Sequence, residues 1–145
     1  MLSKSQAKLF FLGGTVFFVL IFLGLTVDTL VNGIPKQTHE ENITDQVRLG
    51  RELWDSNNCM GCHSIMGEGA YYAPELTKVY ERRGPDYIKT ALNFPGGWQL
   101  TGRRMVQYHF TEKEKDGIVA FLKWVGEVDL NGFPPKPSIN LNNKN

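Results

Sequence analysis

The chain divides into a long apolar stretch near the N-terminus and a mixed, mainly polar remainder. The nineteen residues 9–27 carry no charge. With a rise of about 1.5 Å per residue, a helix of that length spans roughly 28 Å, close to a hydrocarbon core of about 30 Å. The pattern therefore predicts that residues 1–31 hold an N-terminal segment and a single transmembrane helix. The alternatives are a buried core helix and a cleaved signal peptide. A core helix is rarely apolar on every face. A signal peptide would be followed by a cleavage site such as Ala-x-Ala, and none follows this stretch.

The charges that flank this stretch predict its orientation. Lys4 and Lys8 precede it, and no acidic residue lies among the first eight. The first basic residue beyond it is Lys36, which is followed by Glu40 and Glu41. Because Lys and Arg near a span favour the cytoplasmic side, we expect a cytoplasmic N-terminus. The rest of the chain then lies in the periplasm, outside a bacterial inner (cytoplasmic) membrane that the chain crosses once.

Beyond the apolar stretch the hydrophobic pattern predicts one small helical unit. Residues 32–42 are polar and include a proline, which is typical of a linker, and residues 131–145 form a tail rich in Pro and Asn. The folded unit is then 43–130, a size at which a bound cofactor commonly supplies part of the stability. The pattern predicts helices over 44–57, 74–82, 85–93 and 112–126.

The ends of these helices carry recognisable signals. Thr44 is an N-cap residue, Pro74 and Pro85 begin the two middle helices, and Thr111 with Glu114 forms a capping box. No convincing run of alternating apolar and polar residues is present, so no strand is expected. The fold class predicted from the pattern is all-α, with long irregular loops.

Composition and charge exclude several classes of protein. The 145 residues carry a formal net charge of +1, so neither a basic nucleic-acid binder nor an acidic disordered chain is indicated, and we expect no nucleic-acid partner. The two cysteines are too few for a disulfide-stapled miniprotein or a four-cysteine zinc site.

The chemistry of the chain is concentrated in one motif, Cys59-Met60-Gly61-Cys62-His63. Two cysteines three residues apart lie one turn apart, so both thiols can add to the vinyl groups of one haem. The adjacent histidine then lies under the iron as its proximal ligand. The motif predicts one covalent haem c, attached to Cys59 and Cys62, with His63 on the iron.

Two other uses of the paired cysteines are weaker. A redox dithiol commonly opens a helix after a strand, and no strand precedes this one. A zinc site needs further ligands, and the only other histidines are His39 and His109.

A thioether on the opposite face of the iron would stabilise the ferrous state, which suits an electron carrier. Met60 and Met66 are tethered too close to His63 to reach that face, whereas Met105 lies 42 residues beyond His63 and can fold over. We therefore expect Met105 as the second axial ligand of the iron. His109 as that ligand, or an open sixth position, remains the alternative.

The predicted first and last helices carry residues suited to a close crossing. Gly50 permits close approach, and Trp54 offers an aromatic face to Phe121 or Trp124. This arrangement resembles the helix crossing of class I cytochromes c.

The whole chain resembles the small cytochrome c subunit of bacterial cytochrome c-dependent nitric oxide reductase. The residues that carry the resemblance are FLGGTVFFVLIFLGLT at 11–26, NNCMGCHSIMGEGAYYAPEL at 57–76, GRRM at 102–105, FLKW at 121–124 and the Pro-Pro pair at 134–135. The run GEGAYYAPEL after the haem motif is the most specific of these. One position departs from the family, since Val106 stands where family members have a proline after the methionine ligand.

The resemblance implies a membrane-anchored electron-transfer subunit that is not catalytic on its own. It implies a large catalytic partner with haem b, haem b3 and non-haem iron, where NO is reduced to N2O. It also implies a soluble periplasmic cytochrome c or copper protein as donor, and a calcium ion at the subunit interface, held through the backbone carbonyls of Gly69 and Tyr71.

Two other functions stay open from the sequence. One is a membrane-tethered cytochrome c shuttle or a monohaem subunit of a haem–copper oxidase, although the short predicted linker favours docking in a fixed complex. The other is a haem-based gas sensor, for which the sequence offers no output module.

Overall fold

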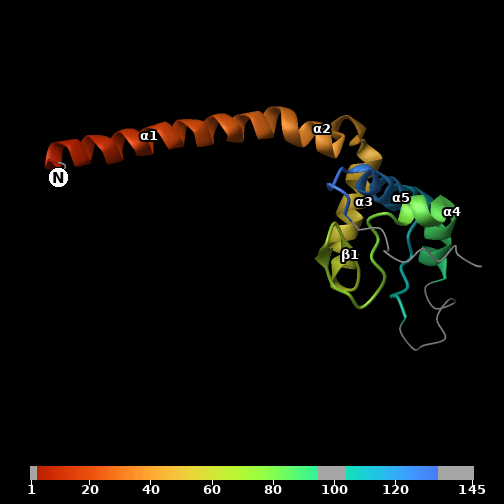
Figure 1. The fold of residues 1–145 in the computed structure, drawn as a ribbon. Coiled ribbons are helices and arrows are strands. Elements are labelled where there is room, and N and C mark those ends of the chain that lie inside the picture. The colour runs from red at the N-terminus through yellow and green to blue at the C-terminus, as the bar shows by residue number, and fades with distance from the viewer. Residues whose placement is uncertain (1–2, 95–103, 134–145) are drawn as a thin grey trace, which may run out of the picture. The chain divides into compact units, whose positions relative to one another are not determined.

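The computed structural model describes residues 3–94 and 104–133 and is mostly helical (Figure 1). The first elements in chain order are α1 (Lys4–Asp28), the π-helical turn η1 (Thr29–Gly33), α2 (Ile34–Thr38), the 3-10 turn η2 (Glu40–Asn42) and α3 (Asp45–Ser56). They are followed by the 3-10 turn η3 (Cys59–Gly61), β1 (Ser64–Ile65), β2 (Glu68–Gly69), α4 (Val79–Asn93) and α5 (Glu112–Glu127). The chain divides into two compact units, Met1–Gln37 and Thr38–Asn145. We call the second unit the haem domain, after the cofactor that its motif predicts.

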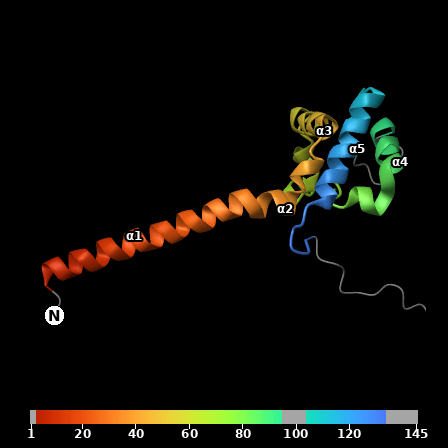
Figure 2. The ribbon, with the colours of Figure 1, turned by 90° about the horizontal axis from the view of Figure 1, so that it is seen from above.

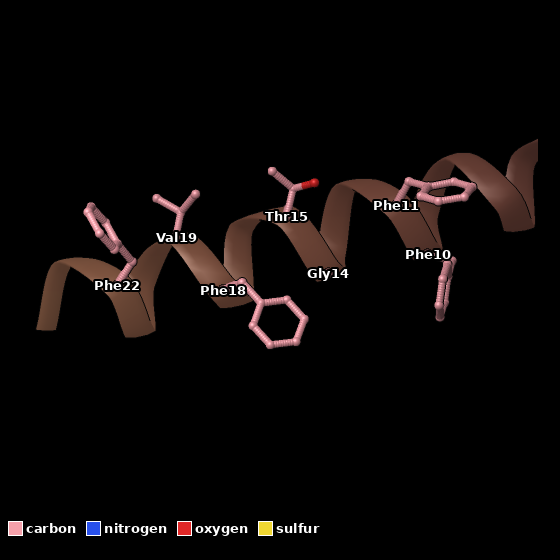
Figure 3. A pocket seen from close by; sticks show the side chains of 7 residues that line it. All are labelled: Phe10, Phe11, Gly14, Thr15, Phe18, Val19 and Phe22. Carbon is pink, nitrogen blue, oxygen red and sulfur yellow. The ribbon is translucent and has the colours of Figure 1, made fainter. Parts of the chain in front are cut away.

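The first unit is one long helix, and within the described residues it is the one helix long and apolar enough to cross a membrane. The helical run Lys4–Thr38 has 35 residues, and none of the residues in its most apolar window is buried. Its length of about 52 Å exceeds a hydrocarbon core of about 30 Å, so the uncharged residues 9–27 suffice to span it. An open groove lies on this helix where Gly14 and Thr15 separate the phenylalanine rings (Figure 3). The groove is lined by Phe10, Phe11, Gly14, Thr15, Phe18, Val19 and Phe22. The helix is consistent with a membrane anchor.

The helix continues through part of the segment for which the sequence predicts a linker. Pro35 has no backbone N–H, and its ring crowds the carbonyl of the preceding turn, which usually breaks a helix. Here the wider π-helical turn η1 precedes it, and the N–H of Ile34 donates to the carbonyl of Thr29 five residues back. Helix α2 ends at Thr38, because His39 takes a left-handed conformation with φ of 49°. The boundary between the two units therefore falls within the predicted linker.

The haem domain is built around the crossing of α3 and α5, with α4 on the other side of α5 (Figure 2). Its buried apolar core consists of Val47, Trp54, Ile65, Val79, Ile88, Leu92, Ile118, Phe121, Leu122 and Val125. The crossing is tight at Gly50, where an added Cβ would lie 2.0 Å from the carbonyl oxygen of Gly117. The close approach expected from Gly50 is confirmed.

The predicted first and last helices of the haem domain are confirmed with their caps. The hydroxyl of Thr44 accepts from the N–H of Val47 at the start of α3. At the start of α5, the hydroxyl of Thr111 accepts from the N–H of Glu114, and the Glu114 carboxylate accepts from the N–H of Thr111. The local sequence fixes both helix starts, because side-chain caps satisfy N–H groups that have no partner within the helix.

The two predicted middle helices appear as the halves of α4, broken at Gly84, which has φ of 78°. The second half begins at Pro85 as predicted, but the predicted start of the first half at Pro74 is wrong, because helix begins only at Val79. Backbone N–H groups before Val79 donate to carbonyls outside this helix. The N–H of Ala73 donates to the carbonyl of Cys62, and the N–H of Leu76 donates to the carbonyl of Ser64.

A short hairpin, β1–β2, was not expected from the sequence. Ser64 pairs with Gly69, and Ile65 pairs with Glu68. The two residues of the turn, Met66 and Gly67, both have positive φ. Positive φ at both positions is typical of a type I′ turn, whose twist matches that of the two strands. The strands have two residues each, too short to show an alternating pattern, and the fold remains mostly helical.

Acidic side chains at the start of α5 should make the stability of the haem domain fall in acid. Lys115 lowers the pKa of Glu112, and the backbone and hydroxyl of Thr111 lower that of Glu114, both from 4.5. A depressed folded-state pKa means that the unfolded chain binds more protons, so this stability is present above about pH 4.5 and is lost as the pH falls through the lower folded values. We expect the urea midpoint of the full chain in detergent to fall between neutral pH and about pH 3. In Glu114→Gln the fall should be shallower, and superimposable curves would contradict the assignment.

Candidate functional site

The two cysteines share one turn that directly follows α3. Asn58 turns the chain with a left-handed conformation, φ of 51°, into η3 (Cys59–Gly61), and the N–H of His63 donates to the carbonyl of Cys59 at 2.9 Å. No disulfide joins the two cysteines; Cys59 is half-buried and Cys62 is exposed. The structure thus brings Cys59, Cys62 and His63 together on one turn.

The pKa of Cys59 argues against a redox dithiol. Burial, followed by the neighbouring Cys62 thiol, raises the pKa of Cys59 to about 11. An attacking dithiol cysteine instead has a lowered pKa, because the thiolate is the nucleophile. The raised pKa of Cys59 does not match that requirement.

His63 is held in one orientation. Its Nδ1 lies 2.8 Å from the carbonyl oxygen of Pro74, so Nδ1 carries the proton and donates it. This leaves the lone pair of Nε2 free for a metal, as in metal sites where the second ring nitrogen of a histidine is fixed by a carbonyl. The ring also packs against Trp54 at 6.4 Å between centroids. The geometry suits an axial ligand.

The segment that follows the hairpin, residues 70–73, is hydrogen-bonded to residues 59–63, which we call the cysteine turn. The N–H of Ala70 donates to Met60 at 3.0 Å, and the N–H of Ala73 donates to Cys62 at 2.8 Å. Gly69 has φ of 113°, and a Cβ there would lie 2.3 Å from the carbonyl oxygen of His63. Only glycine fits this position, which gives a steric reason for the glycine in the Glu-Gly-Ala run.

The donor set fits a covalent haem better than a bare metal ion. Over residues 3–94 and 104–133, no group of three or more His, Cys, Asp or Glu side chains could hold a metal ion. Two thiols one turn apart and one imidazole with a free Nε2 are what a c-type haem requires.

Met60, Met66 and Met105 are all partly buried and pack against the core of the haem domain. Met105 is half-buried and packs against the core of the haem domain, whereas His109 is exposed. Met60 and Met66 lie in and beside the cysteine turn. Residues 102 and 103 of the GRRM run lie outside the described residues, as does the Pro-Pro pair at 134–135. The ligation by Met105 stays a prediction.

The aromatic contact expected between the first and last helices is present. Trp54 is 3% exposed and packs on Phe121 at 5.9 Å between centroids, and Phe121 stacks on Trp124 at 6.3 Å. Pro74 carries no sequence signal for its contact with His63, because it acts through its backbone carbonyl. The contact between the Tyr108 hydroxyl and the Asn57 carbonyl likewise has no signal in the sequence.

Comparison with known proteins identifies the family of the chain. The cytochrome c family model matches residues 47–126. The NorC subunit of nitric oxide reductase from Stutzerimonas stutzeri is 43% identical over 140 residues, covering 92% of this chain and 94% of the relative. The NorC proteins of Halomonas halodenitrificans and Paracoccus denitrificans are 41% and 36% identical, covering 94% and 92% of this chain and 97% and 95% of the relatives.

The chain belongs to the NorC family of nitric oxide reductase subunits. Membership in this family of cytochromes c implies one covalent haem c, an electron-transfer role and partnership with a catalytic subunit. The cytochrome c match runs from α3 to the end of α5, so it contains the cysteine turn, His63 and Met105.

Proposed function

We propose that this chain is the membrane-anchored monohaem electron-transfer subunit of a nitric oxide reductase. It accepts single electrons from a soluble periplasmic cytochrome c or copper protein and passes them to haem b of a catalytic subunit, whose haem b3 and non-haem iron reduce NO to N2O. The observation that carries the proposal is the turn with Cys59, Cys62 and a His63 ring fixed by Pro74, in a chain of this family.

The residues of the chain hold and tune the cofactor and catalyse no bond chemistry. Haem c supplies a one-electron couple. Cys59 and Cys62 would hold the haem covalently, and His63 Nε2 and the Met105 thioether would bind its iron. The carbonyl of Pro74 keeps the His63 ring in place. No base, nucleophile or metal pair is required of this chain, so the NO chemistry belongs to the catalytic partner.

The apolar N-terminal helix places the chain in a membrane, and the segment around Gly69 and Tyr71 belongs to the interface with the catalytic subunit. The apolar residues 9–27 anchor the chain in the bacterial inner membrane, with Lys4 and Lys8 in the cytoplasm and the haem domain in the periplasm. The carbonyls of Gly69 and Tyr71 contribute to a calcium site at the interface with the catalytic subunit. In support, residues 70–73 are hydrogen-bonded to the cysteine turn, and Tyr71 is 78% exposed there.

The short segment between the helical run Lys4–Thr38 and α3 supports a fixed complex rather than a swinging shuttle. Helix continues to Thr38 and resumes at Asp45, and the 3-10 turn Glu40–Asn42 occupies part of the gap. A shuttle that exchanges partners needs a longer flexible connection.

Purification from detergent-solubilised membranes tests the proposal. We expect the chain to co-purify with a subunit that contains haem b and non-haem iron, and the complex to consume NO when a reduced periplasmic cytochrome is supplied. The isolated chain should accept electrons from that donor but consume no NO. Recovery of the chain without such a subunit, or NO consumption by the chain alone, would overturn the proposal.

Replacing Met105 with alanine should remove the thioether from the iron. The ferric haem is expected to lose its methionine-to-iron charge-transfer band, and the midpoint potential is expected to fall, because a thioether ligand raises it. Met66→Ala is the matched control, since Met66 lies in the hairpin turn only three residues after His63. A Met105→Ala spectrum equal to that of the unmodified chain would show that Met105 is not the ligand.

A further inference from the structure

Among the described residues, the contacts that hold the segment with Met105 come from side chains. Residues 104–110 form neither helix nor strand, and the backbone hydrogen bonds between described residues include none from this segment to another backbone group. Met105 and Phe110 pack against the apolar core. Apolar packing alone is non-directional, so a polar contact is needed to define the register of the segment.

Tyr108 makes that polar contact. Its ring stacks on Phe110 with 5.0 Å between centroids and 14° between planes, and its hydroxyl donates to the carbonyl oxygen of Asn57 at 3.4 Å. The contact joins residues 51 positions apart in the sequence. At 3.4 Å the bond is long for O–H···O, so its contribution lies at the weak end of the usual range.

The acceptor for Tyr108 is itself fixed in place. Asn57 caps the C-terminus of α3: its N–H donates to Leu53 at 3.1 Å, and its side-chain amide donates to the same carbonyl at 2.8 Å. Carbonyls at the end of a helix lack intrahelical partners and carry partial negative charge, so they readily accept a hydroxyl. Asn57 lies two residues before Cys59, so the bond ties the Met105 segment to the cysteine turn.

We infer that Tyr108 is a positioning residue that holds the Met105 segment closed over the haem. The inference rests on the proposed ligation by Met105 and adds the contact that keeps that ligand in place. In support, burial raises the pKa of Tyr108, so its hydroxyl keeps its proton and can donate to the Asn57 carbonyl. Loss of the hydroxyl should let Met105 leave the iron more often without removing it as a ligand.

Binding of imidazole to the ferric haem of the full chain tests the inference, because imidazole can reach the iron only after Met105 leaves. In Tyr108→Phe the ring stack is kept and the hydroxyl is lost. We expect imidazole to bind about two- to fivefold faster than in the unmodified chain, the change that one weak hydrogen bond supplies. The methionine-to-iron charge-transfer band should remain in the variant before imidazole is added.

Tyr80→Phe is the matched control, since Tyr80 lies on α4 and packs beside Lys123. It should bind imidazole at the rate of the unmodified chain, and both variants should unfold within a few degrees of the unmodified chain. An unchanged rate in Tyr108→Phe, with a much faster rate in Met105→Ala, would overturn the inference and leave Met105 as the ligand. Equal rates in Met105→Ala and the unmodified chain would instead overturn the ligation itself.

Discussion

Replacing Gly50 with alanine is expected to destabilise the haem domain by about 2 to 4 kcal/mol. The added Cβ would lie 2.0 Å from the carbonyl oxygen and 2.5 Å from the carbonyl carbon of Gly117. Both are backbone atoms of α5, so relief requires α3 and α5 to move apart. Alanine favours a helix over glycine by about 1 kcal/mol, which is too little to offset that separation.

Gly117→Ala is the control for the Gly50 variant because it adds the same methyl group at the same crossing. Its Cβ would lie 3.2 Å from the nitrogen of Gly50 and 3.3 Å from the side chain of Leu49, which can shift. We expect a loss within about 1 kcal/mol, since the helix propensity of alanine offsets much of the crowding. Urea unfolding of the haem-loaded chain measures both variants. A Gly50→Ala variant as stable as the unmodified chain would show that the crossing is looser than the structure has it.

Features with local causes could be predicted from the sequence. Thr44 and Thr111 cap α3 and α5 through N–H groups three residues away, so the residues that decide each helix start are neighbours in the sequence. The spacing of Cys59, Cys62 and His63 is also local, because one turn sets the distance between the thiols. The uncharged stretch 9–27 is long enough to predict its helix by length alone.

Features decided by distant partners could not be predicted. Pro74 is a favourable first residue of a helix, yet its carbonyl accepts from His63, and its neighbours pair with the cysteine turn. These bonds join residues about ten apart and outweigh a local preference of a few tenths to one kcal/mol. The contact between Tyr108 and Asn57 spans 51 residues and likewise has no local signal.

Replacing both Cys59 and Cys62 with alanine is expected to abolish covalent haem completely. The chain has no other cysteine, so no thioether can form elsewhere. Haem staining after denaturing electrophoresis should show no band for the double variant. The chain should also accumulate poorly, because a domain this small commonly draws part of its stability from a bound cofactor. His63 alone could hold the haem only through its iron, a bond that denaturation breaks.

The single variants separate attachment from folding. Cys59→Ala and Cys62→Ala each leave one thiol that can form one thioether, so each should keep a stained band of reduced intensity. The loss of staining should be greater in Cys59→Ala than in Cys62→Ala. The Cys59 side chain is half-buried and packs on the core, whereas Cys62 is exposed. Met60→Ala is the control, since it alters the same turn and keeps both thiols. A stained band from the double variant would mean that the pigment is bound through another group, and the haem assignment would then fail.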